Sequence, residues 1–217
     1  MAGPSLVRED GSLLSRADRS LHRFETWLSL VAGIVIFLLM LLAVGQILGR
    51  KLFNMPVPGF IDWVEQAMAV FAFLGIAYCQ RVGGHIRMDI LIGQLRRRWL
   101  WLAEIVSTLL MLFLSIVLTI GSWRHFQRAF DWNAPMFSRD SSIDIALPLW
   151  PAKLLVPLAL GLLTLRLLLQ LWGYIRALKE GTEEPIAVPM ILSAAEEAAL
   201  EAEHVQGAEE EIRGRRT

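Results

Sequence analysis

Four long apolar stretches dominate this 217-residue sequence and most constrain what it can fold into. The hydrocarbon layer of a bilayer is about 30 Å thick, so a helix needs about 20 mostly apolar residues to cross it. Backbone groups in lipid must hydrogen-bond internally, which favours helices for such stretches. The sequence therefore predicts four transmembrane helices, at Trp27 to Leu48, Val64 to Cys79, Leu100 to Trp123 and Leu147 to Tyr174.

The second apolar stretch is short and begins among polar residues, Asp62, Glu65 and Gln66. It can span only if these groups lie at the membrane interface or face another protein surface. Asp62 and Glu65 are three residues apart, which predicts that they share a helix face. We expect at least Glu65 to meet a basic or hydrogen-bonding group, on another subunit or at Arg50 or Arg124. The alternative is that both carboxylates simply reach water.

Composition and charge restrict the rest of the chain. With 55% hydrophobic residues, few residues remain outside the spans, so no separate soluble enzyme domain is expected. Zero net charge gives no reason to expect a nucleic-acid partner. We predict three parts: an N-terminal segment (1–23) with a short surface helix at 15–23, a membrane domain (24–178), and a polar tail (179–217) with a helix at 193–203.

Lysine and arginine are shared unequally between the two sides of the membrane. Eleven flank the spans in the N-terminal segment, the second loop and the C-terminal flank, against five in the first and third loops. Loops rich in these residues stay in the cytoplasm. The bias predicts that both termini are cytoplasmic.

The second loop combines an apolar helical repeat with clustered arginines. Its apolar side chains recur from Met88 to Trp99 at the spacing of one helix face, which predicts a short helix lying in the membrane interface. A plain polar linker is the alternative. Basic and aromatic side chains there would contact lipid headgroups, and the candidates are Arg87, Arg96, Arg97, Arg98 and Trp99. The predicted fold is an all-α integral membrane protein with four transmembrane helices and this interfacial helix.

Two charged residues lie inside the later spans. Glu104 and Arg166 fall at similar depths, which predicts an intramembrane ion pair. The alternative is that Arg166 reaches the headgroups while Glu104 lies at the interface. Two isolated charges are too few for a proton relay or a substrate path.

The sequence shows no catalytic, metal or cofactor motif. The four histidines fall in separate segments, and the single cysteine excludes a cysteine cluster. Phosphate-binding loops and the nucleophile elbow of hydrolases are missing. A membrane anchor or electron-transfer subunit is the alternative class, but it needs buried histidine ligands that the spans lack. A small channel would need a polar stripe along one helix.

Several short motifs resemble one family of membrane proteins. The stretch Gly59 to Glu65, the residues Phe73 to Ala77 and the segment His85-Ile86-Arg87-Met88-Asp89 are similar to the small membrane subunit of tripartite ATP-independent periplasmic (TRAP) transporters. The similarity continues through Ser141 to Trp150 and covers about residues 20–178. Many relatives carry two consecutive acidic residues where this chain has Glu65-Gln66.

The resemblance implies a non-catalytic, cofactor-free four-helix subunit in a bacterial inner membrane. Its partners would be a large permease subunit, which carries the substrate and sodium sites, and a periplasmic binding protein that delivers an organic acid. The small subunit would act as a scaffold during cation-coupled uptake.

Overall fold

The computed structural model describes residues 12–81, 97–180 and Ala202. These residues form helices and loops without a strand, although two isolated bridges, Phe130–Ser138 and Ser141–Pro148, occur in one loop. The helices are α1 (Leu13–Leu52), α2 (Phe60–Leu74), α3 (Ile76–Arg81), α5 (Arg97–Ala129), the short 3-10 helix η1 (Pro135–Phe137) and α6 (Trp150–Glu180).

The four predicted spans are confirmed as helices long and apolar enough to cross a membrane. The second consists of α2 and α3 together, which meet at Gly75. The first three spans extend beyond the predicted apolar stretches at both ends, because a helix can continue through polar residues that keep its backbone hydrogen bonds. The third loop therefore begins after Ala129, six residues later than predicted. The fourth span begins at Trp150, three residues after the predicted Leu147, and extends past Tyr174 to Glu180.

The first helix begins much earlier than its apolar stretch. The Ser12 hydroxyl caps it by accepting a hydrogen bond from the Ser15 backbone N–H at 3.3 Å. Residues 15–23, for which a separate surface helix was predicted, instead form the first turns of α1. The boundary drawn at residue 23 therefore falls inside a continuous helix of 40 residues.

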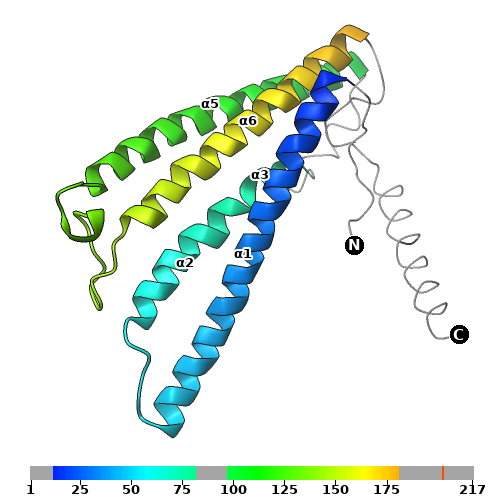
Figure 1. Ribbon diagram of the computed structural model, residues 1–217. Helices are drawn as coiled ribbons and strands as arrows, with labels where there is room; N and C mark the ends of the chain where they lie inside the picture. Colours follow the sequence, from blue (N-terminus) through cyan, green and yellow to red (C-terminus); the bar gives the residue numbers. More distant parts are fainter. Residues whose placement is uncertain (1–11, 82–96, 181–201, 203–217) are drawn as a thin grey trace, which may run out of the picture.

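The helices form two antiparallel pairs, α1 with α2 and α5 with α6, which diverge from one end of the molecule (Figure 1). We call this the terminal end, because α1 begins and α6 ends there. The loop end carries the α1–α2 and α5–α6 loops. The α5–α6 contact contains packed leucines and a hydrogen bond of 2.8 Å between the Ser115 and Thr164 hydroxyls. Such small hydroxyl residues let two helices approach closely within lipid.

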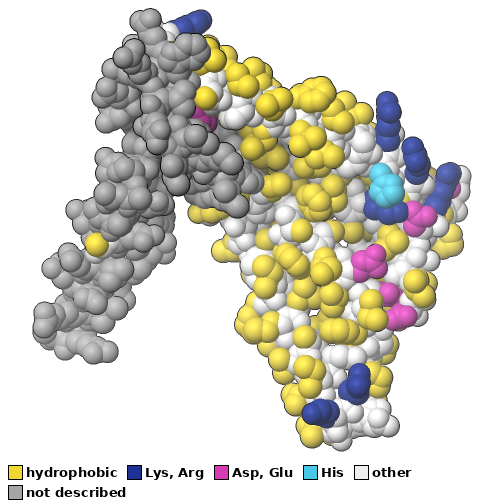
Figure 2. All heavy atoms as spheres, turned by 180° about the vertical axis from the view of Figure 1, so that it is seen from behind, with side chains coloured by type: hydrophobic (Ala, Val, Ile, Leu, Met, Phe, Trp, Pro, Cys, Tyr) yellow, Lys and Arg dark blue, Asp and Glu magenta, His cyan; other side chains and the backbone are white. Residues whose placement is uncertain are grey.

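The outer surface of the bundle is largely apolar. Figure 2 shows hydrophobic side chains over much of the described surface, with most of the visible charged groups toward the loop end. Only 6% of the most apolar 18-residue window of α1 is buried, against 39% of that of α6. Lipid chains solvate such side chains as well as other apolar side chains do, so this exposure is compatible with a membrane.

Gly59 allows the α5–α6 loop to lie over the start of α2. Its φ of 64° is in the left-handed region, which L side chains rarely adopt. A Cβ atom on this residue would also lie 2.5 Å from the Cδ1 atom of Ile145. A glycine is thus required twice over at this crossing, both by its backbone and by the close approach of the loop.

Two sequence predictions lie outside the described residues. The interfacial helix of the second loop falls mainly within residues 82–96, and α5 is already helical from Arg97. The predicted tail helix at 193–203 is described only at Ala202, which is helical.

Candidate functional site

Four charged side chains from three helices form a buried cluster at the terminal end, which we call the ion-pair cluster. Arg166 on α6 donates from Nε to Glu25 Oε1 at 2.8 Å, and its other nitrogens bond to Glu25 and Asp18. Arg81 on α3 donates to Asp18 Oδ2 at 2.8 Å. None of the four residues is more than 3% exposed. The cluster contains two cations and two anions, so it is neutral as a whole.

A pair of glutamines continues the ion-pair cluster across α3 and α6. Gln80 donates from its side-chain amide to Gln170 Oε1 at 2.8 Å, and Gln170 donates to the Gln80 backbone carbonyl at 3.2 Å. Gln80 precedes Arg81, and Gln170 lies one turn beyond Arg166. Polar groups in a span are tolerated when they bond to one another. The glutamine pair joins α3 to α6, and the ion-pair cluster joins both of these helices to α1.

The ion-pair cluster supplies Arg166 with partners that differ from the predicted one, Glu104. Its guanidinium contacts Asp18 and Glu25, two residues that sequence analysis assigned no role, and it is 0% exposed. Glu104 on α5 is also buried, at 5% exposure. A direct contact between Glu104 and Arg166 stays a prediction.

At the loop end, Asp62 binds the α5–α6 loop to the first turn of α2. Its Oδ2 atom accepts hydrogen bonds from the Ser142 hydroxyl at 2.6 Å and from the Ile145 backbone N–H at 2.9 Å. The Ser142 oxygen in turn accepts from the Leu147 N–H at 2.8 Å. Nearby, the Gln66 amide donates to the Pro148 carbonyl at 2.8 Å. We call these contacts the Asp62 clamp.

Asp62 and Glu65, which were predicted to share a helix face, both lie on α2 but differ in burial. Asp62 is 3% exposed, whereas Glu65 is exposed. In the part of the chain that the structure describes, no hydrogen bond or ion pair joins the Glu65 side chain to Arg50, Arg124 or any other residue. A partner on another subunit stays a prediction.

Ion pairs also order the α5–α6 loop itself, which lies outside the spans. Asp131 accepts from Arg139 Nε and from the Asn133 backbone N–H, each at 3.0 Å. The Asn133 N–H and then Arg139 hold the pKa of Asp131 below its usual value. The hydrogen bond and positive charge of Lys153 likewise lower the pKa of Asp140.

The predicted headgroup contacts are only partly within the described residues. Arg97, Arg98 and Trp99 form the first turn of α5, while Arg87 and Arg96 lie outside the described part. Their contacts with lipid stay a prediction.

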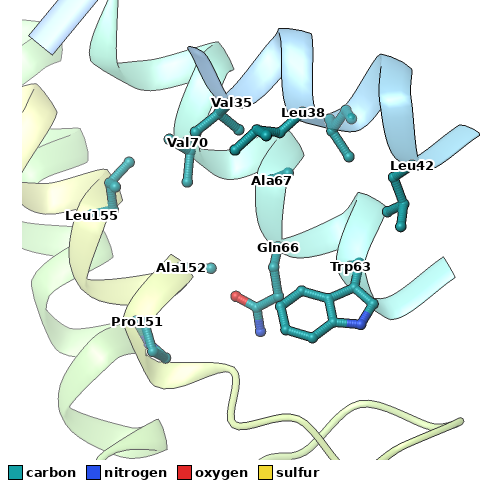
Figure 3. A pocket seen from close by; sticks show the side chains of 11 residues that line it. Val35, Leu38, Leu42, Trp63, Gln66, Ala67, Val70, Pro151, Ala152 and Leu155 are labelled. Carbon is teal, nitrogen blue, oxygen red and sulfur yellow. The ribbon is translucent and has the colours of Figure 1, made fainter. Parts of the chain in front are cut away.

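A groove opens between α1, α2 and α6 with a cavity volume of about 480 Å³ (Figure 3). Trp63 and Gln66 of α2 lie across it from α1, and α6 closes its third side. A second apolar groove of about 660 Å³ runs along α6 beside α1. Apolar walls of this kind accommodate lipid chains or a neighbouring helix better than a polar substrate. The remaining side chains that line the first groove are Val35, Leu38, Leu39, Leu42, Ala67, Val70, Pro151, Ala152 and Leu155.

These features define a class: a small multi-pass helical membrane protein whose buried polar side chains hold its own helices together. No group of three or more His, Cys, Asp or Glu residues suited to a metal ion occurs among the described residues. The sequence profile of the family described as "Tripartite ATP-independent periplasmic transporters, DctQ component" matches residues 39–177. The chain belongs to this family, the small membrane component of TRAP transporters. No curated protein matches the chain closely.

Proposed function

We propose that this chain is a non-catalytic scaffold for the large permease subunit of a TRAP transporter. In this role the large subunit takes up an organic acid together with a cation, and a periplasmic binding protein delivers the acid. The small subunit neither binds the acid nor carries the coupling ion. It holds the large subunit in place in the bilayer.

The observation that carries this proposal is how the buried polar groups are used. In the described spans, Arg166, Arg81 and their carboxylate partners bond to one another, as do Gln80 and Gln170. Transporters need polar groups that face a substrate near the middle of the membrane. Here those groups fasten α1, α3 and α6 together, which supports a structural role.

A scaffold must also resist tilting and vertical movement. Tryptophans prefer the interface between lipid and water, and partly exposed Trp123, Trp132 and Trp150 lie at or near the loop end. Trp150 Nε1 also donates to the Met136 carbonyl at 3.0 Å, which joins the start of α6 to the α5–α6 loop. These side chains would fix the depth of α5 and α6 in the bilayer.

The proposal includes an orientation in a bacterial inner membrane, with the terminal end in the cytoplasm. The positive-inside bias of the sequence supports it. Arg87, Arg96, Arg97, Arg98 and Trp99 would then meet cytoplasmic headgroups. The α5–α6 loop would face the periplasm, where the binding protein arrives.

Reconstitution tests the scaffold role. Liposomes containing this chain alone, the large subunit alone or both would be given binding protein, candidate organic acids and a sodium gradient. We expect uptake only with both membrane subunits present. Uptake by this chain alone would overturn the proposal, and so would full uptake by the large subunit alone.

A further inference from the structure

Within the described residues, one face of α2 packs against no other element. Ile61, Glu65, Met68 and Ala72 follow one another at helical spacing, and all four are exposed. Ile61 is 68% exposed and Met68 54%. We call this the Glu65 face. It points away from the groove of Figure 3, toward which α2 turns Trp63, Gln66, Ala67 and Val70.

Glu65 forms no hydrogen bond or ion pair with Arg50 at the basic end of α1, although both residues are described. Trp63 and Gln66, on either side of Glu65 in sequence, line the groove together with Leu42. Leu42 precedes Arg50 by eight residues, which is about 12 Å along a helix at 1.5 Å per residue. The other predicted partner, Arg124, lies on α5, which packs mainly against α6.

The neighbouring carboxylate, that of Asp62, has hydrogen-bond donors that Glu65 lacks among the described residues. Asp62 is held by Ser142 and the Ile145 N–H because the α5–α6 loop crosses that side of α2. One turn further on, the loop still accepts a hydrogen bond from Gln66, which lines the groove, but it leaves Glu65 uncovered. Lipid chains offer no hydrogen-bond donor, so a carboxylate on an apolar face is unfavourable unless interfacial water or another protein supplies a partner.

We propose that the Glu65 face binds a transmembrane helix of the large permease subunit, and that this helix presents an arginine, lysine or hydrogen-bond donor to Glu65. This inference rests on the proposed function and specifies its contact surface. Ile61, Met68 and Ala72 supply the apolar contact, and the small Ala72 lets the helices approach closely near the C-terminal end of α2. Glu65 fixes the register of the two helices.

Photo-crosslinking in membranes locates the surface. A benzoylphenylalanine would replace Met68 on the Glu65 face or, as a control of similar exposure, Leu118 on α5, which is 48% exposed. With both subunits expressed, we expect an adduct with the large subunit from position 68 and at most a weak one from position 118. Adducts from position 118 alone, or only lipid adducts from position 68, would overturn the inference.

Substitutions at Glu65 test the polar contact. Glu65→Leu removes it and makes the isolated chain more apolar, so the amount of chain in the membrane should not fall. Co-purification of the large subunit should drop about tenfold, which corresponds to roughly 1.4 kcal/mol of binding free energy. Glu65→Gln should retain more of the complex if the partner is an uncharged donor and lose as much as Glu65→Leu if it is a cation. Normal co-purification with Glu65→Leu would show the inference to be wrong.

The same preparations separate this inference from the proposed function. If the unsubstituted chain fails to co-purify with the large subunit, the scaffold proposal itself fails. If it co-purifies normally while Glu65→Leu has no effect and position 68 gives no adduct, only the Glu65 face is wrong.

Discussion

The two ends of the bundle are held together by different kinds of bond. At the terminal end, charged side chains from three helices bond directly to one another and are almost fully buried. At the loop end, Asp62 and Gln66 of α2 bond mainly to the backbone and one hydroxyl of the α5–α6 loop. The helices meet at the first end and diverge toward the second (Figure 1).

The difference shows where the bundle is closed and where it is open to a neighbour. Direct ion pairs between helices require the helices to touch, and each partner is left with an unpaired buried charge if the other is lost. A loop can follow two helices that stand apart, so the Asp62 clamp connects the pairs while the groove between them stays open. The terminal end would therefore provide rigidity, and the loop end would provide surface for a partner.

Reporter fusions test which end lies in the cytoplasm, and their effect is all or none. Fusions after Asn54 and Asn133 should be active only for a periplasmic reporter, and fusions after Gly93 and Glu180 only for a cytoplasmic one. The expectation follows from the lysine and arginine bias. Activity of the periplasmic reporter at Gly93 would mean that the second span does not cross.

Among substitutions, Arg166→Met should have the largest effect on stability. It leaves Glu25 without its partner in a buried site, while Asp18 retains Arg81. Removing one member of a buried ion pair typically costs about 3 to 5 kcal/mol. The unfolding midpoint of the purified chain, measured in lipid nanodiscs, should fall markedly.

A second substitution distinguishes a lost ion pair from lost packing. Adding Glu25→Gln to Arg166→Met removes the unpaired charge, so the double variant should be more stable than Arg166→Met alone. Equal melting of the two variants would indicate that Arg166 contributes through its volume and not through its charge.

The sequence predicted the number of spans and the importance of Arg166, but not the partners of Arg166. Long apolar stretches indicate spans strongly because few other structures accommodate them. Asp18 and Glu25 lie before the first stretch, in a segment with the composition of a solvated flank. Their spacing of seven residues, two helical turns, places both on one face of α1 and was the available signal. It becomes informative only once α1 is known to begin at Leu13.

Helix spacing alone cannot predict which of the two carboxylates, Asp62 or Glu65, is buried. Residues three apart are neighbours on a helix surface, yet they point about 60° apart at 100° per residue. Which of the two is covered depends on the path of a loop about 80 residues later in the chain. That path depends on the left-handed turn at Gly59 and on the contact of Ile145 there.

Asp62→Ala should have a smaller effect than Arg166→Met and act locally. The Ser142 hydroxyl and the Ile145 N–H lose their acceptor, and each unsatisfied buried group costs about 1 to 3 kcal/mol, less where water can enter. Hydrogen exchange of residues 140–149 should accelerate. Glu65→Ala is the matched control, and in the isolated chain we expect it to change stability by no more than about 0.5 kcal/mol. If Glu65→Ala proves the more damaging in the isolated chain, the assignment of the clamp to Asp62 is mistaken.

The smallest expected effect is an acid sensitivity confined to the α5–α6 loop. The pKa values of Asp131 and Asp140 are lowered by hydrogen bonds and by Arg139 and Lys153. Their contribution to stability is therefore complete above the ordinary pKa of 3.8 and is lost as pH falls through the lower values of the folded chain. Hydrogen exchange of residues 130–149, corrected for intrinsic rates, should rise below about pH 4.

Asp140→Asn tests that this acid sensitivity comes from the pair with Lys153. The variant should loosen the loop slightly at neutral pH and show a flatter acid response, because one of the two ion-paired carboxylates of the loop is gone. Asp144→Asn is the control, since the Asp144 carboxylate makes no ion pair within the described part of the loop. The effect should be small because exposed ion pairs are screened by water. If Asp140→Asn leaves the acid response unchanged, the Asp140–Lys153 pair does not stabilise the loop end, and that role falls to the Asp62 clamp.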